Sequence, residues 1–361
     1  MPVKERKKED IKNLTFPELE EFVTSLGEPR YRARQLMGWL YYHKVSSFEE
    51  MTDLPKEFRS TLVDHFYLST LKPQQVLTSH DGTLKFLFGL DDGNCIESVL
   101  IPEKKHYTIC ISTQVGCALG CTFCLSGKGG LVRNLVPSEI TNQVCTIQRE
   151  FLPEGVTCNI VCMGMGEPLH NYDHTLKALT ILTTPLGFNF SHRRITVSTA
   201  GLVPQLKKLG QALPVNLAIS LNASTNEVRN VLMPINKKYP LEELLDAASR
   251  LPLQPRKRIT FEYILIKDIN DSLTNAKELV KVLKHTRCKI NLIPFNEHEG
   301  VAFKRPTDEK VQQFRQCLVS KHFTVMVRES KGSDISAACG QLRLHGLKMK
   351  PTSAMNALQV L

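Results

Sequence analysis

The spacing of apolar residues changes along the chain and divides it into regions. In residues 14–27 and 29–44 apolar side chains recur every three or four positions, which predicts two short helices. Residues 74–101 alternate apolar and polar positions around two Asp-Gly pairs, a pattern typical of strands joined by hairpin turns. The N-terminal part of the chain therefore predicts a small helical segment followed by antiparallel strands.

From about residue 107 onward, apolar strand-like runs recur and are mostly separated by polar segments of helix length. Alternating strands and helices predict parallel βαβ units, and six or more such units indicate a complete or partial (β/α) barrel. In that architecture the functional residues lie in the loops that follow the strands. The expected strands are TICISTQV, CNIVCM, RRITVST, VNLAISL, RITFEYILI, KINLIPF and TVMVRE.

These patterns predict an α/β protein with four segments. We expect a small helical accessory domain at 1–70, a β-hairpin linker or extension at 71–106, a barrel core at 107–345 and a C-terminal tail at 346–361. A length of 361 residues suits one large domain with a smaller appendage. A hydrophobic fraction of 42% with 23% charged residues is that of an ordinary soluble protein.

Composition and charge narrow the choice of compartment and partner. No apolar run approaches transmembrane length, and the start MPVKERKKEDIKN lacks the apolar stretch of a secretory signal, so we expect a cytoplasmic protein without membrane contact. The net charge of +10 favours a polyanionic partner such as nucleic acid. The helix predicted at 29–44 interleaves basic and aromatic residues, which suits either RNA binding or a packed aromatic core with a solvated basic face.

Eleven cysteines in a reducing compartment indicate metal or redox use rather than a disulfide framework. Six of them stand singly among apolar neighbours and are interpreted as small buried residues: Cys95, Cys145, Cys158, Cys162, Cys288 and Cys317.

The strongest chemical signal is the triplet Cys117-Ala-Leu-Gly-Cys121-Thr-Phe-Cys124, placed directly after the first predicted barrel strand. Three thiolates this close in sequence can surround one metal centre. A [4Fe–4S] cluster has four irons, so three protein ligands leave one iron open for a further ligand. Zinc is the rival interpretation, but a zinc site normally needs a fourth ligand in paired spacing, and no such partner follows nearby.

Glycines and small polar residues stand at the ends of the later predicted strands. Glu167 can pair with an ammonium group, and the neighbouring glycines let the backbone approach a ligand. Because the ends of parallel strands converge at one edge, these residues together favour a ligand pocket. They are Gly166, Glu167, Ser198, Ser220, Leu221, Asn222 and Asn296.

The cysteine triplet resembles the signature of the radical S-adenosylmethionine (SAM) superfamily. In that superfamily SAM chelates the open iron, and an electron cleaves it to a 5′-deoxyadenosyl radical. The resemblance implies a [4Fe–4S] cluster held by Cys117, Cys121 and Cys124, SAM bound by the strand-end residues, and a partial (β/α)6-type radical SAM barrel.

A narrower resemblance extends from about residue 14 to residue 343. The segments IESVLIP, CISTQVGC, GMGEPL, LMPIN and DISAACGQL occur in the order found in the RlmN family of dual-specificity RNA adenine-carbon-2 methyltransferases. The resemblance implies methylation of adenosine 2503 in 23S ribosomal RNA (rRNA) and of adenosine 37 in certain transfer RNAs (tRNAs). It also implies that the N-terminal helices form an RNA-binding accessory domain.

The chemistry of that family implies roles for three more residues. Carbon 2 of adenine is electron-poor and cannot attack the SAM methyl group, whereas a carbon radical can add to it. Cys339 matches the cysteine that SAM methylates first, before a second SAM yields the radical that removes a hydrogen from its S-methyl group. Cys110 matches the cysteine that releases the product by a transient disulfide with Cys339. Glu97 matches the proposed proton acceptor at carbon 2.

The sequence departs from the family in places. Asn222 stands where the family usually has histidine, Leu125-Ser126 replaces Ala-Thr, and residues 297–310 differ, which leaves the substrate preference open, especially for tRNA. The sister Cfr family, which methylates carbon 8, shares the triplet and both accessory cysteines, although Pro168 stands where it commonly has alanine. A non-catalytic zinc RNA-binding protein is a further alternative. We expect an electron donor such as flavodoxin or ferredoxin, and a monomer.

Overall fold

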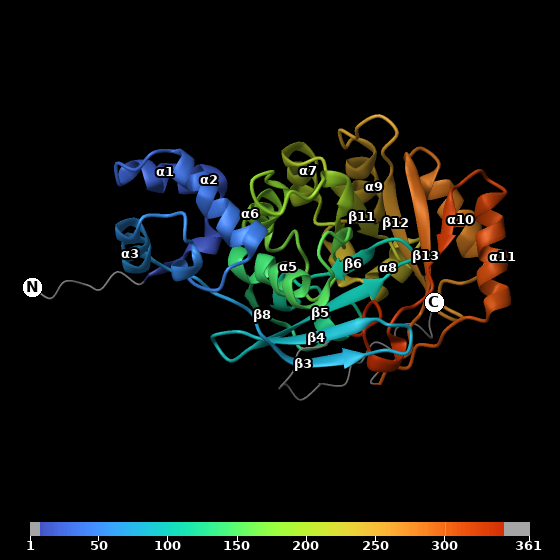
Figure 1. Cartoon of the computed structure of the whole chain (residues 1–361). Coiled ribbons are helices and arrows are strands. Elements are labelled where there is room, and N and C mark those ends of the chain that lie inside the picture. The colour runs from blue at the N-terminus through green and yellow to red at the C-terminus, as the bar shows by residue number, and fades with distance from the viewer. Residues whose placement is uncertain (1–7, 300, 343–361) are drawn as a thin grey trace, which may run out of the picture. The chain divides into compact units, whose positions relative to one another are not determined.

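The computed structural model describes residues 8–299 and 301–342, which form two compact units (Figure 1). The helical unit combines the described residues up to Lys72 with Leu135–Val156 and Asp173–Ser191. The sheet unit contains Pro73–Asn134, Thr157–Tyr172 and the described residues from His192 onward. The units therefore interleave along the chain instead of following the predicted segment boundaries. The predicted tail at 346–361 lies outside the described residues.

Both predicted N-terminal helices are confirmed. α1 spans Phe16–Ser25, and α2 spans Tyr31–Met37 before a π-helical stretch continues to His43. The start of α1 is fixed because the Glu18 carboxylate accepts a hydrogen bond from Thr15 N at 2.8 Å. The unit also contains α3 (Lys56–His65), α5 (Pro137–Phe151), most of α6 (Tyr172–Thr183), the paired β1 (Glu9–Asp10) and β2 (Phe66–Tyr67), and 3-10 turns at Ile11–Asn13 and Phe48–Glu50.

The aromatic residues predicted on the second helix divide between the core and the surface. Tyr41 is completely buried, and its hydroxyl donates to Lys12 O at 3.1 Å. Tyr31 and Tyr42 are 52% and 67% exposed. The helix therefore has both a packed aromatic side and an exposed side with aromatic residues, and RNA binding by the exposed side stays a prediction.

The sheet unit is built on one ten-stranded sheet in the order β14-β13-β12-β11-β10-β9-β6-β5-β4-β3. From β6 to β14 the neighbouring strands run parallel, and the runs predicted as barrel strands are all found there. The predicted α/β fold with a partial barrel is thus confirmed. The strands are β3 (Pro73–Thr78), β4 (Leu84–Gly89), β5 (Cys95–Pro102), β6 (Tyr107–Cys110), β9 (Cys158–Cys162), β10 (Ile195–Thr199), β11 (Asn216–Ser220), β12 (Ile259–Leu265), β13 (Cys288–Pro294) and β14 (Val325–Val327).

The predicted hairpins are also present, and they belong to the same sheet. β3, β4 and β5 pair antiparallel through turns at the two Asp-Gly pairs. β5 then pairs antiparallel with β6, with Val99 opposite Cys110. The β-hairpin extension therefore continues directly into the parallel strands and brings its residues beside theirs.

The surroundings of the cysteine triplet differ from the prediction. The first barrel strand ends at Cys110, and a separate short strand, β7 (Gln114–Gly116), precedes the triplet. β7 pairs antiparallel with β8 (Leu131–Asn134). The triplet therefore follows this small ribbon rather than the barrel strand itself, because the chain turns away from the sheet after β6.

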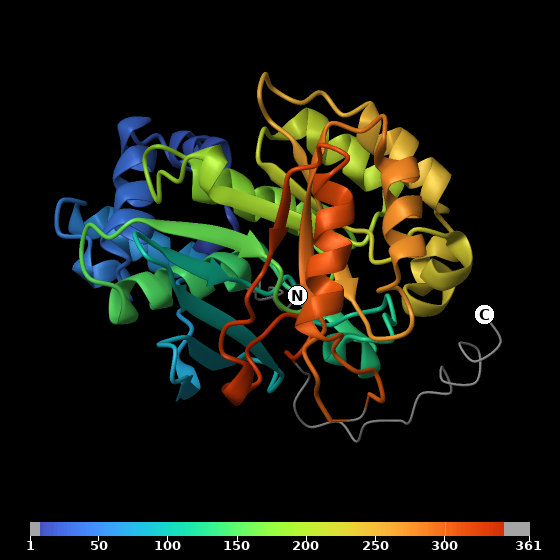
Figure 2. The same cartoon turned by 90° about the vertical axis from the view of Figure 1, so that its right-hand side faces the viewer.

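Helices of the sheet unit lie between the strands in sequence, and Figure 2 views the unit with α11 in front. The Tyr263 ring on β12 lies 5.4 Å from the Phe314 ring on α11, so this helix packs on the sheet. No helix in the described residues is long and apolar enough to cross a bilayer. The helices are α4 (Leu125–Lys128), α7 (Val203–Ala212), α8 (Asn226–Leu232), α9 (Leu241–Ser249), α10 (Leu273–Leu283) and α11 (Asp308–Val319), with 3-10 turns at His192–Arg194, Pro234–Lys237 and Ser333–Ile335.

The six cysteines interpreted as buried only partly follow that prediction. Cys145, Cys158, Cys162 and Cys288 are buried. Cys95 and Cys317 are half-buried, so the prediction is wrong for these two. Cys95 begins β5 beside a hairpin turn, where a strand residue has fewer neighbours.

Candidate active site

The three cysteines of the triplet lie in one loop between β7 and α4, and backbone hydrogen bonds fix this loop at several points. Cys117 N donates to Gly130 O at 2.9 Å, and Thr122 N donates to Leu232 O at 3.0 Å. Gly116, just before the loop, has a φ of 76°, and an added Cβ would lie 2.0 Å from Gly130 O. Only glycine fits there, so the close turn that starts the loop depends on it.

The surroundings of the three sulfur atoms are apolar but contain backbone donors. The N–H group of Leu119 bonds the Cys117 sulfur, and those of Ser126 and Gly127 bond the Cys124 sulfur. Burial raises the pKa of Cys117 to about 12, and it raises the pKa of Cys121 and that of Cys124 as well. Three thiolates in such a place need a positive centre to stabilise them.

A cavity with about 790 Å³ of space, part of it open to solvent, lies between this loop and the carboxyl ends of the parallel strands. Its walls include all three triplet cysteines and most of the residues predicted to bind SAM: Gly166, Glu167, Ser198, Ser220 and Asn222. The expected convergence of these strand ends is therefore found.

Glu167 is buried and joins two of the strand-end loops. Its carboxylate accepts hydrogen bonds from Leu169 N at 3.1 Å and from Ala200 N at 2.8 Å, and its own N–H donates to the Gln114 side chain at 2.8 Å. Burial outweighs these bonds and raises the pKa of Glu167 to about 7. Gly166 before it has a φ of 99°, which lets the backbone pass close to Gln114.

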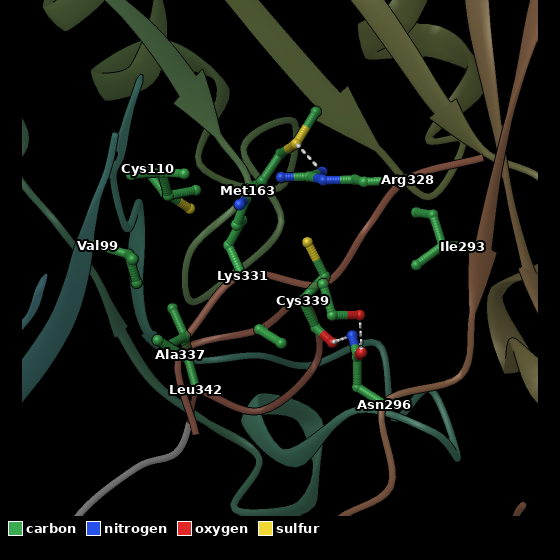
Figure 3. A pocket seen from close by; sticks show the side chains of 13 residues that line it. Val99, Cys110, Met163, Ile293, Asn296, Arg328, Lys331, Ala337, Cys339 and Leu342 are labelled. Carbon is green, nitrogen blue, oxygen red and sulfur yellow. Dashed lines mark hydrogen bonds between the residues drawn. The ribbon is translucent and has the colours of Figure 1, made fainter. Parts of the chain in front are cut away.

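A second cavity, with about 460 Å³ of space, brings Cys110 and Cys339 together (Figure 3). Both are free thiols on different walls, with Met163 and Arg328 also lining the space. Cys339 borders the first cavity as well. Nearness to Cys339 raises the pKa of Arg328, while burial raises the pKa of Cys110 well above its usual value. The two cysteines that the resemblance linked, 229 positions apart by their numbers (339 − 110), therefore meet at one cavity.

Asn296 contacts the segment that carries Cys339. Its side-chain Nδ2 donates to Cys339 O at 3.3 Å, and its Oδ1 accepts from the Ser330 hydroxyl. It lines the second cavity, not the first. Its observed contacts therefore hold the Cys339 segment, and its predicted contact with SAM stays a prediction.

Comparisons with known proteins agree with this geometry. Residues 9–68 match the family described as the ribosomal RNA large subunit methyltransferase N-terminal domain, and residues 111–280 match the radical SAM superfamily. The dual-specificity RNA methyltransferase RlmN of Geobacter sulfurreducens is 53% identical over 351 residues, which are 97% of this chain and 96% of that protein. The chain belongs to the RlmN family.

Further relatives agree with the RlmN assignment. The protein of the same name from Syntrophotalea carbinolica is 52% identical over 335 residues, which are 92% of this chain and 89% of that protein. The crystal structure of a radical SAM methyltransferase from Sphaerobacter thermophilus has a TM-score of 0.88 and 44% identity, covering 93% of this chain and 99% of that one. This RlmN family member is accordingly a radical SAM methyltransferase, with an iron–sulfur cluster and SAM as its cofactors.

The residues present fit both cofactors. Three thiols in one loop, with backbone N–H groups bonded to two of the sulfurs and apolar side chains around them, are what an iron–sulfur cluster requires. Among the His, Cys, Asp and Glu side chains of residues 8–299 and 301–342, no group of three is already arranged to hold a metal ion. The adjoining cavity borders all three cysteines, and its Glu167 carboxylate can pair with the ammonium group of SAM.

Other predicted residues of this RlmN protein are held by bonds within the protein. Ser198 donates to Glu262 at 2.9 Å. The Asn222 amide oxygen accepts from Ile264 N at 2.9 Å, and the residue has a φ of 58°, a conformation that asparagine tolerates. Leu221 is completely buried and is not among the cavity-lining residues. The roles assigned to these residues stay predictions.

Sequence reasoning missed several polar residues of the site. Arg229 is completely buried, and its guanidinium donates to Ala200 O at 2.7 Å and to Leu221 O at 3.0 Å, which ties the ends of β10 and β11 together. Arg328 and Glu262 line the two cavities. The only signal in the sequence was a charged residue inside or next to an apolar run.

Proposed function

We propose that this enzyme methylates carbon 2 of adenosine in RNA, at adenosine 2503 of 23S rRNA and at adenosine 37 of some tRNAs. The observation that carries the proposal is the meeting of Cys110 and Cys339 at one cavity, next to the cavity of the three-cysteine loop. Methylation of a nucleophilic nitrogen or oxygen needs neither extra cysteine, whereas an electron-poor ring carbon needs a radical route with a covalent carrier.

In this proposal Cys117, Cys121 and Cys124 hold a [4Fe–4S] cluster, and each turnover uses two SAM molecules. When bound, the cluster supplies the electron that lets one SAM act as a hydrogen-atom acceptor. The cluster receives this electron from a one-electron donor of the flavodoxin or ferredoxin class. The cavity residues surround the proposed SAM site, and Glu167 orients SAM through its ammonium group.

The protein's own residues carry the methyl group. The Cys339 thiolate accepts a methyl group from SAM, and after hydrogen removal its methylene carbon bonds to carbon 2 of the base. Glu97 takes the proton from carbon 2, and the unpaired electron that the radical addition leaves on the ring would return to the cluster, so that the adduct becomes a closed-shell thioether before it is cleaved. The Cys110 thiolate then attacks the Cys339 sulfur, so that a disulfide forms, the sulfur–methylene bond breaks, and its electron pair stays on the methylene carbon, which gains a proton and becomes the methyl group. The disulfide must be reduced before the next turnover.

The test is anaerobic incubation of the reconstituted enzyme with SAM, a reductant and a transcript that contains the ribosomal target. Nucleosides are then identified by mass spectrometry. We expect 2-methyladenosine. Formation of 8-methyladenosine instead would contradict the proposed position, and intact SAM cleavage without any methyladenosine would contradict the proposed substrate.

A further inference from the structure

A buried lysine connects two parts of the site. Lys85 lies on β4 and is only 8% exposed. Its Nζ lies 3.2 Å from Glu97 Oε1 and donates to Ser336 O at 3.2 Å. Ser336 stands three positions before Cys339, so one ammonium group contacts both the proposed proton acceptor and the segment that carries the methyl group.

The strand register explains this geometry. β4 and β5 run antiparallel with Lys85 opposite Val99. Side chains two positions apart share one face of a strand, so Glu97, Val99 and Lys85 lie on the same face of the sheet. Val99 and Ile101 line the cavity that contains Cys110 and Cys339. The ion pair therefore lies on the sheet face that borders this cavity.

Stability alone does not explain a charged pair at this place. Desolvating an ammonium group and a carboxylate costs free energy, and an apolar pair of similar size would serve a sheet core as well or better. Glu97 is only 1% exposed, so its carboxylate cannot rely on water for orientation. What Lys85 adds is a fixed direction for this carboxylate.

The Cys339 segment has further anchors that do not involve Lys85. Asp334 accepts from the Ser79 hydroxyl at 2.6 Å and from His80 N at 3.2 Å, and Gly332 N donates to Asp81 at 3.1 Å. These contacts attach the segment to the β3–β4 turn. Loss of Lys85 should therefore leave the segment bound to the sheet but free to shift near Ser336.

We propose that Lys85 is a positioning residue that holds the Glu97 carboxylate in line with the base carried on Cys339. Lys85 contacts the carboxylate through the ion pair and the Cys339 segment through Ser336 O, so one side chain links the proton acceptor to the segment that carries the base. This inference rests on the proposed function.

The test is a double-mutant cycle of Lys85→Met and Glu97→Gln, with Lys85→Arg as the conservative variant. Lys310→Met is the matched control, because Lys310 also pairs with acidic side chains, but its partners are Asp268 and Asp271 rather than Glu97. Three quantities are measured on the full chain: S-methylation of Cys339 without RNA, the single-turnover rate of adenosine methylation, and hydrogen exchange of the peptide around Ser336.

For Lys85→Met we expect Cys339 methylation within about twofold of the unaltered enzyme but RNA methylation slowed at least about tenfold, since general-base contributions are typically 10²–10⁴-fold. The double variant should be no slower than Glu97→Gln alone. Lys85→Arg should recover most of the rate, and exchange around Ser336 should rise in the two variants that carry Lys85→Met but not in Glu97→Gln or Lys310→Met. Because the double variant removes both charges of the pair, it avoids the buried carboxylate without its ammonium partner that could unfold Lys85→Met.

Two outcomes overturn the inference. In the first, the double variant slows RNA methylation by the product of the factors measured for the two single variants. In the second, Lys85→Met slows Cys339 methylation as much as RNA methylation. An unaltered enzyme that methylates no adenosine contradicts the proposed function instead. In that case hydrogen exchange still tests whether Lys85 holds the Cys339 segment. Unchanged exchange around Ser336 in Lys85→Met would show that it does not.

Discussion

Replacement of Arg229 by methionine should destabilise the sheet unit strongly. The guanidinium donates to Ala200 O at 2.7 Å, Leu221 O at 3.0 Å, Ser220 O at 3.2 Å and the Asn236 side chain at 2.9 Å. Burial lowers the pKa of Arg229 to about 10, so it still carries its charge at neutral pH. Methionine fills much of the same space but leaves these acceptors without a donor.

The size of the effect follows from these bonds. A buried acceptor that loses its partner costs about 1–3 kcal/mol, and removal of a buried charge returns part of its desolvation cost. We therefore expect Arg229→Met to lower the free energy of unfolding by about 3–5 kcal/mol, a large share of the roughly 5–15 kcal/mol of an ordinary domain. The assay is urea unfolding of the cluster-free protein under reducing, anaerobic conditions, followed by circular dichroism.

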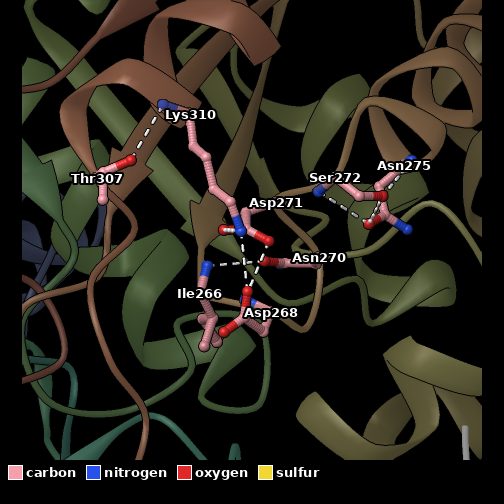
Figure 4. Close-up of polar contacts among 8 residues, drawn as sticks. All are labelled: Ile266, Asp268, Asn270, Asp271, Ser272, Asn275, Thr307 and Lys310. Carbon is pink, nitrogen blue, oxygen red and sulfur yellow. Dashed lines mark hydrogen bonds and ion pairs between the residues drawn. The ribbon is translucent and has the colours of Figure 1, made fainter.

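The matched control for Arg229→Met is Lys310→Met. Lys310 pairs with Asp268 at 2.9 Å and Asp271 at 3.5 Å at the start of α11 (Figure 4). Its side chain is 43% exposed, and ion pairs of exposed charges contribute little to stability, so Lys310→Met should unfold at nearly the same urea concentration as the unaltered protein. If Arg229→Met costs as little as Lys310→Met, the carbonyl groups around Arg229 do not depend on it and the reasoning is refuted.

Three further predictions concern the cysteines and one carboxylate. Cys339→Ala should abolish RNA methylation and Cys110→Ala should trap RNA on the protein as a species stable in denaturing gels; full activity of either variant would contradict the covalent route. Cys121→Ala should lose bound iron, measured by metal analysis, whereas Cys145→Ala in the helical unit should keep it, and equal iron in both would contradict the ligand assignment. Partial burial of Asp81 opposes ionisation, but hydrogen bonds to its carboxylate outweigh it and lower its pKa from 3.8 to about 2. The Asp81 carboxylate therefore adds to the free energy of unfolding above pH 4, and this addition is lost as the pH falls toward 2. A plot of the free energy of unfolding against pH should fall less steeply in acid for Asp81→Asn than for the unaltered protein. Identical plots would contradict this.

Much of the fold could be predicted because its signals are local. The apolar runs of the parallel strands and the two Asp-Gly turns are visible in any short window of sequence. The convergence of Glu167 and Ser198 also followed from the sequence, since carboxyl ends of parallel strands share an edge. Family resemblance added Cys110 and Cys339, whose meeting no local pattern indicates.

The remaining features depend on contacts between distant residues. β7 and β8 are too short to show a period, so their ribbon was missed. From the sequence alone, Arg229 would be expected on the solvent-exposed side of a helix. It is buried because carbonyl groups at the ends of β10 and β11 accept its hydrogen bonds. Asn222 was predicted as a ligand contact, but its left-handed backbone and its bond to Ile264 N give it a structural task that sequence spacing does not show.

The closure of the cysteine loop has a consequence for biosynthesis. Leu125 N donates to Gly340 O at 2.8 Å, and the Ser126 hydroxyl donates to Leu342 O at 2.6 Å across 216 positions of sequence. A ribosome releases the loop long before it releases the segment that covers it. Until residue 342 has been made, these two contacts cannot form, so the covering of this side of the loop is among the last contacts of the sheet unit to be completed.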